Sequence, residues 1–404
     1  MATVFALAFP AILLAHPGAL DARGGHRNRA TGRYHCHTKA CRGGGTSAAD
    51  TPTIRRVSRV ADIPSGSPAT GHYRIHLIDV GTGLAVLVQG SDFNLRYDGG
   101  SQDDSRGLRQ RGRTLSRLHA YLWAAVGGSG PNECTPDGDA ATPATAERTI
   151  HHVVLSHPHE DHVSMLDEVL FCYRVRHVWD AGVPAETVTY TNFLAQVALE
   201  AEARYHTASA PTKNRTRTSR GQSFRFPRWT SFGARSSVEL GRGATMTVLY
   251  ANGQPAHDPN QNSVVVRLDL GTTSLLLTGD AESGPRLPPD SPPGDAEAWM
   301  LANVRELLDV DILQVGHHGS LTSSRRAFLD AVSPTVALIG SGPHEYSGVR
   351  LPDPEIETAL RAVGARVLGT YEHDGGGCDV SDRVGMDDER PGGCDNWILE
   401  LASL

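Results

Sequence analysis

The sequence predicts an α/β fold in which apolar strands end in loops that carry histidine and aspartate. Short runs rich in β-branched residues alternate with segments of helical spacing along most of the chain. Three apolar runs, at 151–156, 273–278 and 310–315, are each followed within two residues by histidine or aspartate. A sheet built from these strands would gather the polar side chains at one edge.

The remaining elements are predicted from the same patterns. The first strands are expected at 73–80, 84–89 and 95–100, and further strands at 175–180, at 263–268 and as a pair within 237–250. Helical spacing predicts helices at 113–126, 165–174, 189–205 and 296–308. Residues 43–71 are rich in Gly, Ser, Thr, Ala and Pro, so we expect a linker there and a main domain over 72–404.

Length and charge exclude some classes of protein. The 404 residues are enough for one large domain or two medium ones. A formal net charge of −7 does not suit a globally basic nucleic-acid binder. No stretch reaches about 18 consecutive apolar residues, so no transmembrane channel is expected in this chain.

The N-terminus predicts export. Residues 1–15 form a short apolar segment of signal-peptide length, and Leu13-x-Ala15 is an acceptable cleavage site. We therefore expect a secreted or periplasmic bacterial protein. Six cysteines would then permit three disulfides, and Cys378 with Cys394 is the pair we favour first; in the cytosol all six would be reduced thiols.

Residues 16–42 form a small module rich in histidine and cysteine. Its imidazoles and thiolates lie at short spacing and are candidate ligands of a separate metal ion: His26, His35, Cys36, His37 and Cys41. The segment resembles a short Y-H-C-H type motif found near the N-terminus of exported bacterial proteins, although Gly25 stands where that motif commonly has cysteine. The alternative is a Gly/Arg-rich tail tethered by one disulfide.

The stretch His157-Pro158-His159-Glu160-Asp161-His162 carries the strongest chemical signal in the chain. Three imidazoles and the Asp161 carboxylate within six residues suit borderline divalent ions such as Zn²⁺, Mn²⁺ or Fe²⁺. Asp280 and the pair His317 and His318 follow the other two apolar strands. A carboxylate such as Asp280 can bridge two ions, and a hydroxide between ions about 3.5 to 4 Å apart is nucleophilic at neutral pH.

Residues 204–235 mix cationic and aromatic side chains. Arginines neutralise phosphates and aromatic rings stack on unpaired bases, so this segment is a candidate grip for single-stranded nucleic acid, with Arg217 and Arg225 as candidate contacts. The alternative is a solvated loop followed by an amphipathic strand that buries Phe224 and Phe226.

Six short motifs occur in a fixed order: H-L-I-D-V-G-T-G, Y-D-G-G, S-H-P-H-E-D-H, N-S-V-V-V-R-L, L-L-T-G-D-A-E and V-G-H-H-G-S-x-T-S-S. Together they resemble the metallo-β-lactamase superfamily, and more closely the metallo-β-lactamase-like domain of the ComEC/Rec2 competence family, over about residues 73–370. The resemblance implies an αββα sandwich with a two-metal site at one edge.

The resemblance also implies roles for individual residues. His157 and His159 match ligands of the first metal, Asp161 and His162 match those of the second, and Asp280 matches the bridging carboxylate. We expect His317 to be the last metal ligand and His318 to touch substrate or donate a proton. The catalytic candidates are His318 and Asp161. Ser320 is a candidate substrate contact. The implied cofactors are two divalent ions, zinc or manganese.

Two departures from the family pattern concern the metal site. The first loop of the family commonly reads D-V-G-Q-G-D, whereas this chain has Thr82 and Leu84, losing an amide and a carboxylate that can support the ligands. A further histidine of the first metal site is not identifiable; the candidates are His177, His206 and His257.

The function predicted from these observations is an exported metal-dependent hydrolase, a phosphodiesterase or nuclease that uses a metal-bridging hydroxide. Its expected partner is a phosphodiester, with single-stranded nucleic acid as the candidate. Because a fold does not fix a substrate, hydrolysis of a lactam, lactone or thioester is an alternative. A non-catalytic surface-binding protein with a degenerate metal site is another.

Overall fold

The structure is a computed structural model that describes residues 52–100, 116–131, 134, 147–342, 344–346, 348–372 and 395–402. It also describes four short strands that pair as two hairpins: β1 (Gly25–Arg27) with β2 (Tyr34–Cys36), and β7 (Arg109–Gln110) with β8 (Arg113–Thr114). The expected signal peptide, His37, Cys378 and Cys394 lie outside the described residues. Among the described helices, none combines the length and the hydropathy needed to cross a membrane.

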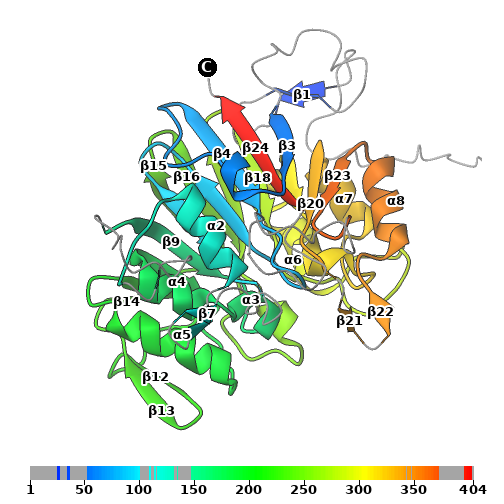
Figure 1. Cartoon of the computed structure of the whole chain (residues 1–404). Helices are drawn as coiled ribbons and strands as arrows, with labels where there is room; N and C mark the ends of the chain where they lie inside the picture. The colour runs from blue at the N-terminus through cyan, green and yellow to red at the C-terminus, as the bar shows by residue number, and fades with distance from the viewer. Residues whose placement is uncertain are drawn as a thin grey trace, which may run out of the picture.

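Two β-sheets pack face to face, with helices on both outer faces (Figure 1). The nine-stranded sheet has the order β14-β11-β10-β9-β6-β5-β4-β24-β3, and the seven-stranded sheet the order β15-β16-β17-β18-β19-β20-β23. This arrangement confirms the predicted αββα sandwich.

The strands of the first sheet are β3 (Thr53–Val57), β4 (His72–Leu77), β5 (Val86–Gln89), β6 (Asn94–Tyr97), β9 (Thr149–Leu155), β10 (Arg174–Asp180), β11 (Arg204–Thr207), β14 (Trp229–Ser231) and β24 (Asn396–Ala402). Its helices are α2 (Arg117–Ala125), α4 (Leu166–Cys172) and α5 (Val188–Leu199). A buried apolar cluster joins these helices to the sheet.

The strands of the second sheet are β15 (Ser237–Gly241), β16 (Ala244–Tyr250), β17 (Val265–Leu270), β18 (Thr273–Leu277), β19 (Ile312–Gln314), β20 (Val336–Ile339) and β23 (Arg366–Gly369). Its outer face is covered by α6 (Asp295–Asn303), α7 (Arg326–Val332) and α8 (Pro354–Ala362). Two hairpins lie outside the sheets: β12 (Thr216–Ser219) with β13 (Gln222–Arg225), and β21 (Glu345–Tyr346) with β22 (Val349–Arg350).

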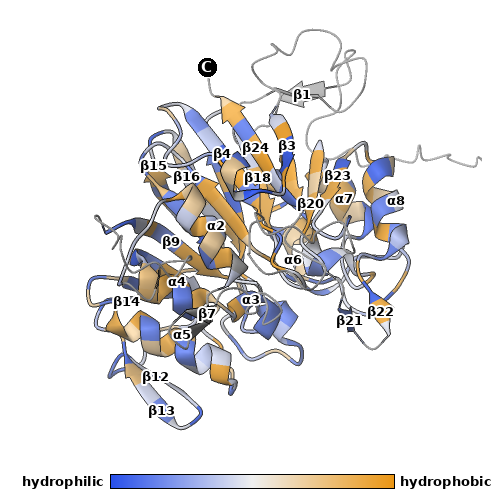
Figure 2. Ribbon diagram, viewed as in Figure 1, coloured by the Kyte–Doolittle hydropathy of each residue, from blue (hydrophilic) through white to orange (hydrophobic). Residues whose placement is uncertain are grey.

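The core between the sheets explains why the inner strands are almost wholly apolar. Val86, Leu95, Val154, Val266 and Leu275 come from both sheets, belong to one cluster and are fully or almost fully buried. Figure 2 shows largely apolar strands at the centre of the molecule and helices that carry both apolar and hydrophilic residues. Each such side chain contributes about 1.5–3 kcal/mol by leaving water, so the two sheets hold each other in place.

All four predicted helices are shorter than their sequence pattern indicates, and two of them show the reason. Helix α2 begins after Ser116, whose hydroxyl accepts a hydrogen bond from the backbone N–H of His119 (3.0 Å), and not at residue 113. Helix α5 ends at Leu199 and not at residue 205, because β11 pairs with β10 and β14 instead of continuing the helix. Pairing between distant strands therefore overrides local helical spacing.

The expected linker contains a strand of the main sheet. β3 pairs antiparallel with β24, which in turn pairs with β4, so the last described strand lies between two of the first (Figure 1). The expected boundary at residue 72 is therefore corrected to a domain that begins by residue 53. The polar sequence Thr-Ile-Arg-Arg-Val misled the prediction because an edge strand needs little apolar surface.

A disulfide joins Cys134 to Cys172 at the end of α4, with Cα atoms 5.8 Å apart. Both cysteines are buried in the cluster beneath α2 and α4. The bond ties the segment that precedes β9 to the helix that follows the loop after β9.

Candidate metal centre

The three predicted loops meet at one edge of the sandwich. His157, His159 and the short helix α3 (Glu160–Val163) follow β9, Asp280 follows β18, and His317 and His318 follow β19. One ligand atom from each of Asp161, His162, Asp280 and His318 lies within 4.8 Å of the other three. Residues more than 150 positions apart in sequence therefore form one cluster.

Asp280 lies at the centre of this cluster. Its Oδ2 is 3.2 Å from His162 Nε2 and 3.3 Å from His318 Nε2. The same oxygen is 3.9 Å from the Nε2 atoms of both His157 and His317. Its Oδ1 is buried and has no hydrogen-bond partner. A buried carboxylate oxygen without a partner is costly unless a ligand satisfies it.

These residues fit a divalent cation. Imidazole nitrogens and carboxylate oxygens face one another at 3.2–3.3 Å, and their lone pairs repel one another when the imidazoles are neutral. A shared cation removes that repulsion, and this donor set suits zinc, manganese or iron. Asp161, His162 and His318 would hold one ion, His157 and His159 the other, and Asp280 would contact both.

The second set of candidate ligands, His157 and His159 with Asp280, is less complete than the first. His157 Nε2 lies 3.0 Å from His159 Nδ1, so the two imidazoles are in direct contact. None of the three candidates for a further ligand joins them: His257 is exposed, and His177 and His206 interact with each other on β10 and β11. Within the described part of the chain, this set therefore has two histidines and the shared Asp280.

The expected order of His317 and His318 is corrected by the structure. His318 is the member of the ligand cluster, is almost fully buried, and donates from Nδ1 to the carbonyl of Gly340 (2.6 Å). His317 points its Nδ1 toward Glu282 Oε1 (2.6 Å) and Thr322 Oγ1 (2.7 Å), and its side chain is 24% exposed. Both residues have positive φ, 46° and 53°, and such strain is kept where it serves a site. This backbone turn, which is not visible in the sequence, decides which imidazole faces inward.

Asp98 is a supporting residue that the sequence analysis did not single out. Its Oδ2 accepts hydrogen bonds from His162 Nδ1 (2.8 Å) and Ser156 Oγ (2.7 Å), and its Oδ1 accepts from the Ser156 N–H (2.7 Å). A carboxylate behind an imidazole fixes which nitrogen is left to bind a cation. The Y-D-G-G motif was the available signal, because it places Asp98 directly after a strand.

Asp98→Asn is expected to weaken metal binding about 10- to 100-fold, because the amide is uncharged and has one accepting oxygen where both Asp98 oxygens accept. Competition with a chromophoric chelator measures this affinity. Asp330→Asn, at an exposed position on α7, is the matched control and should bind metal as the wild type does. Equal affinity in both variants would show that Asp98 does not orient His162.

The unusual first loop still supports the site, through its backbone. The N–H of Leu84 donates to the carbonyl of Asp161 (3.1 Å), so the change of side chain at this position leaves the contact intact. The hydroxyl of Thr82 accepts from the N–H of His344 (3.2 Å) and so fixes the segment after β20. The two departures from the family pattern therefore do not remove the loop from the site.

Two glycines allow the loops to approach closely. A Cβ on Gly99 would lie 2.2 Å from the backbone oxygen of Ser164. Gly279 has φ +54°, and a Cβ there would lie 2.5 Å from the Cβ of Ser156. Any larger residue would push the loop after β9 away from Asp280.

The carboxylates favour positive charge at the centre of the cluster. Burial alone would lower the pKa of His318, but Asp280 and Asp161 outweigh it and raise that pKa to about 10. Burial likewise opposes the pKa shift of Asp280, yet His162, His318 and His317 hold it well below its ordinary value. The pocket is built for cationic charge, which either protons or a metal ion can supply.

Two expected substrate contacts are corrected. Ser320 is 1% exposed, and its hydroxyl accepts from Arg286 Nη1 (3.1 Å) and the N–H of Thr322 (3.2 Å). Arg217 is 6% exposed, donates to the carbonyl of Gly182 and to Ser209 Oγ, and lies over the rings of Tyr205 and Trp229. Both side chains hold loops together instead of facing solvent.

The aromatic side chains of 204–235 also pack inward. Phe226, Trp229 and Phe232 are buried, and Phe224 packs against the same core cluster as Phe226. The expectation that these rings stack on nucleic-acid bases is therefore corrected in favour of the alternative, in which Phe224 and Phe226 pack into the core. Arg225 is exposed on β13, and Lys213 is exposed in the loop before β12.

A row of imidazoles crosses the first sheet away from the metal cluster. The rings of His152 and His177 stack with centroids 4.7 Å apart, and His177 Nδ1 shares a hydrogen bond with His206 Nε2 (2.9 Å). His206 in turn stacks on Trp179 with centroids 4.0 Å apart. Burial, followed by His177 and Arg204, lowers the pKa of His206 to about 3.

This row is expected to make the fold sensitive to acid. The unfolded chain takes up a proton near pH 6.5, whereas folded His206 does so only near pH 3, so its contribution is complete above pH 6.5 and is lost as the pH falls toward 3. Urea unfolding at pH 7 and pH 5 should show a loss on the order of 1–2 kcal/mol from this residue. In His206→Gln the pH dependence should be smaller by that amount; an unchanged difference would contradict the assignment.

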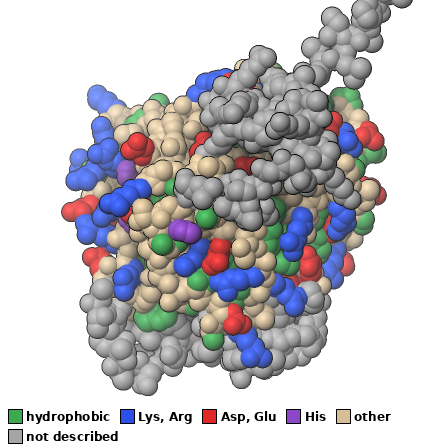
Figure 3. All heavy atoms as spheres, turned by 90° about the horizontal axis from the view of Figure 1, so that it is seen from above, with side chains coloured by type: hydrophobic (Ala, Val, Ile, Leu, Met, Phe, Trp, Pro, Cys, Tyr) green, Lys and Arg blue, Asp and Glu red, His purple; other side chains and the backbone are tan. Residues whose placement is uncertain are grey.

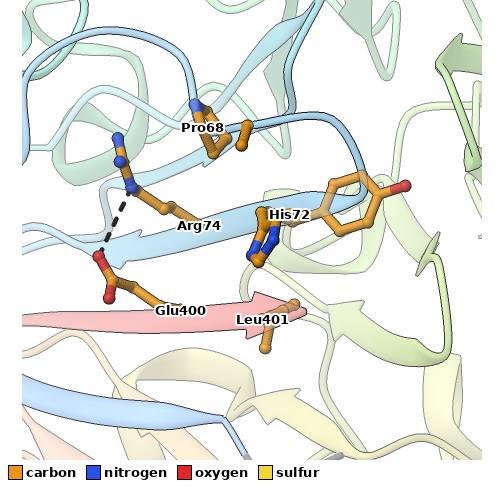
Figure 4. A pocket seen from close by; sticks show the side chains of 7 residues that line it. Pro68, His72, Arg74, Glu400 and Leu401 are labelled. Carbon is orange, nitrogen blue, oxygen red and sulfur yellow. Dashed lines mark ion pairs between the residues drawn. The ribbon is translucent and has the colours of Figure 1, made fainter. Parts of the chain in front are cut away.

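Among the described residues, no second group of histidine, cysteine or carboxylate side chains is arranged to hold a metal ion. Figure 3 shows cationic and acidic side chains interspersed on the face seen from above. A shallow pocket of about 230 Å³ lies between the start of β4 and the end of β24, and Figure 4 shows Arg74 paired with Glu400 (3.6 Å) beside His72. None of its lining residues is a ligand candidate of the metal cluster.

An αββα sandwich that gathers histidines and aspartates at the ends of its strands, around one shared carboxylate, defines a metal-dependent hydrolase fold. Comparison with known families agrees: the chain belongs to the metallo-β-lactamase superfamily, whose family model matches residues 78–344.

Known relatives also confirm the resemblance to ComEC/Rec2 proteins. The chain is 25% identical to the uncharacterized protein YcaI of Escherichia coli over 75% of this chain and 29% of that protein. It is 42% identical to Recombination protein 2 of Haemophilus influenzae over 20% of this chain and 9% of that protein. The chain thus spans less than a third of either relative.

Among solved structures, the metallo-β-lactamase-fold protein YhfI from Bacillus subtilis is 12% identical, with a TM-score of 0.40 over 74% of this chain and 97% of that one.

Proposed function

We propose that this protein is an exported phosphodiesterase that hydrolyses nucleic acid with two divalent ions. The observation that carries the proposal is the position of Asp280, whose Oδ2 faces one ligand set through His162 and His318 and another through His157. A pair of ions at this point would supply a nucleophilic water and polarise a substrate oxygen. The chain needs no side-chain nucleophile for such a reaction.

The residues around the cluster have defined tasks in this reaction. Asp98 orients His162, Glu282 orients His317, and the carbonyl of Gly340 orients His318. The oxygen of water forms a new bond to phosphorus, the bond from phosphorus to one ester oxygen breaks, and that oxygen leaves with a proton. The exposed edge of His317 lies beside Asp280, on the side open to solvent.

Support for a nucleic-acid substrate comes from the relatives and from charge. One relative is named Recombination protein 2, and recombination is a process that acts on nucleic acid. Arg225 and Lys213 are exposed near the β12–β13 hairpin, where they are available to phosphates. The contacts we propose are therefore to the backbone of the nucleic acid, without stacked bases.

Support for export comes from the disulfide between Cys134 and Cys172, since such bonds persist mainly in oxidising compartments. The apolar segment 1–15 is the proposed signal.

A substrate panel tests the proposed reaction. Purified protein loaded with Mn²⁺ or Zn²⁺ is offered bis-p-nitrophenyl phosphate, single-stranded DNA, RNA, nitrocefin and a lactone. We expect cleavage of the phosphodiesters and none of nitrocefin or the lactone. Turnover of nitrocefin or the lactone alone, or no turnover with any metal, would refute the proposal.

A further inference from the structure

The β21–β22 hairpin reaches from the second sheet to the metal cluster. After β20 the chain passes the first loop so closely that a Cβ on Gly342 would lie 2.4 Å from the backbone of Gly81 and Thr82. The hydrogen bond from the His344 N–H to Thr82 Oγ1 then anchors the hairpin. The position of the hairpin is therefore set by the same loop that contacts Asp161 through Leu84.

Tyr346, on β21, makes the contact with the cluster. Its hydroxyl donates to Asp161 Oδ2 (2.7 Å), the same oxygen that lies 3.3 Å from His318 Nε2. Unlike the ligands, Tyr346 is 38% exposed, and the ring of His344 packs edge-on against it with centroids 4.9 Å apart. The phenol thus lies between the buried cluster and solvent.

This position differs from that of the other groups that support the ligands. Asp98 and the carbonyl of Gly340 contact imidazoles from the buried side and are sealed from solvent. Both are acceptors, so neither can bind an anionic oxygen. Tyr346 is a donor on the open side, and a donor is the group that an anionic substrate oxygen needs.

We propose that Tyr346 is a substrate-binding residue whose hydroxyl donates to a non-bridging oxygen of the scissile phosphoryl group. This inference rests on the phosphodiesterase function proposed above. In the absence of substrate the hydroxyl donates to Asp161, which is also an anionic oxygen, so the hydrogen bond is exchanged for one of the same kind. The ring of His344 holds the phenol in this direction.

The test uses metal-loaded full-length protein and the conservative variant Tyr346→Phe, which keeps the ring and removes only the hydroxyl. Tyr371→Phe is the matched control, since that half-buried hydroxyl also donates to a carboxylate, Glu357, on the far side of the second sheet. Three quantities are measured for each protein: bound metal, binding of inorganic phosphate by calorimetry, and kcat and KM for bis-p-nitrophenyl phosphate.

We expect Tyr346→Phe to keep the metal content of the wild type, to bind phosphate about tenfold more weakly, and to lose about 10- to 100-fold in kcat/KM. Tyr371→Phe should match the wild type in all three. Loss of metal in proportion to loss of activity would overturn the proposal, because Tyr346 would then only position Asp161. Phosphate binding and kcat/KM within twofold of the wild type would overturn it as well.

The two proposals fail in different ways. If the wild-type protein cleaves no phosphodiester, the proposed function is lost, whereas phosphate binding still reports on the Tyr346 hydroxyl. If the wild type is active and Tyr346→Phe is equally active, only the role of Tyr346 is lost.

Discussion

Replacing Asp280 with asparagine is expected to remove the two-metal site and its activity together. The substitution keeps the size of a side chain that is 2% exposed, so the fold should survive. It replaces one oxygen by an NH₂ group, which cannot bind a cation, and it removes the negative charge that both ligand sets face. Metal content should fall from about two ions per chain to one or fewer.

The expected loss of phosphodiester turnover in Asp280→Asn is at least about 10³-fold, which corresponds to ~4 kcal/mol of transition-state stabilisation. Plasma mass spectrometry gives the metal content, and release of p-nitrophenol gives the rate. Asp290→Asn changes an exposed aspartate in the loop before α6 and should behave as the wild type does. Full activity of Asp280→Asn with two bound ions would be incompatible with a bridging role.

The second large effect concerns stability. Cys134 and Cys172 are 38 residues apart, and a cross-link over that length restricts the unfolded chain by about 4 kcal/mol in loop-closure entropy. The double variant Cys134→Ala/Cys172→Ala should lose a free energy of unfolding of that size, measured by guanidinium denaturation. The midpoint of denaturation should shift to a lower guanidinium concentration, as it should in reduced wild-type protein.

Reduction supplies the internal control for this prediction. Dithiothreitol should destabilise the wild type much more than the double variant, because the variant has no bond at this position to lose. If thiol titration of the unreduced, denatured wild type finds all six cysteines free, the disulfide is absent and the support for export disappears with it.

Much of the fold was predictable from local sequence, and the reason is physical. The inner strands are largely buried, so 151–156, 273–278 and 310–315 each have an apolar, partly β-branched centre that is easily recognised. Strands at and next to the sheet edges carry weaker signals, because β3 and β11 bury only part of their surface. Their pairing with β24 and β10 depends on chain segments that local patterns do not connect.

Part of the candidate site was likewise predictable from the sequence, and part was not. The types of ligand and their places after strands were readable, because a metal requires imidazole and carboxylate and a sheet edge requires a loop. Which of two adjacent histidines turns inward was not readable. That choice depends on positive φ at both residues and on acceptors contributed by Gly340 and Glu282, which are distant in sequence.

The sequence by itself determined the αββα class, the family resemblance and the set of residues able to bind a cation. Tertiary structure alone decided that His318 joins the cluster, that Arg217 and Ser320 are buried in internal contacts, and that Asp98 and Tyr346 touch the ligands. Composition and spacing record which groups a chain possesses. The direction in which each group points depends on backbone angles and partners that only packing brings together.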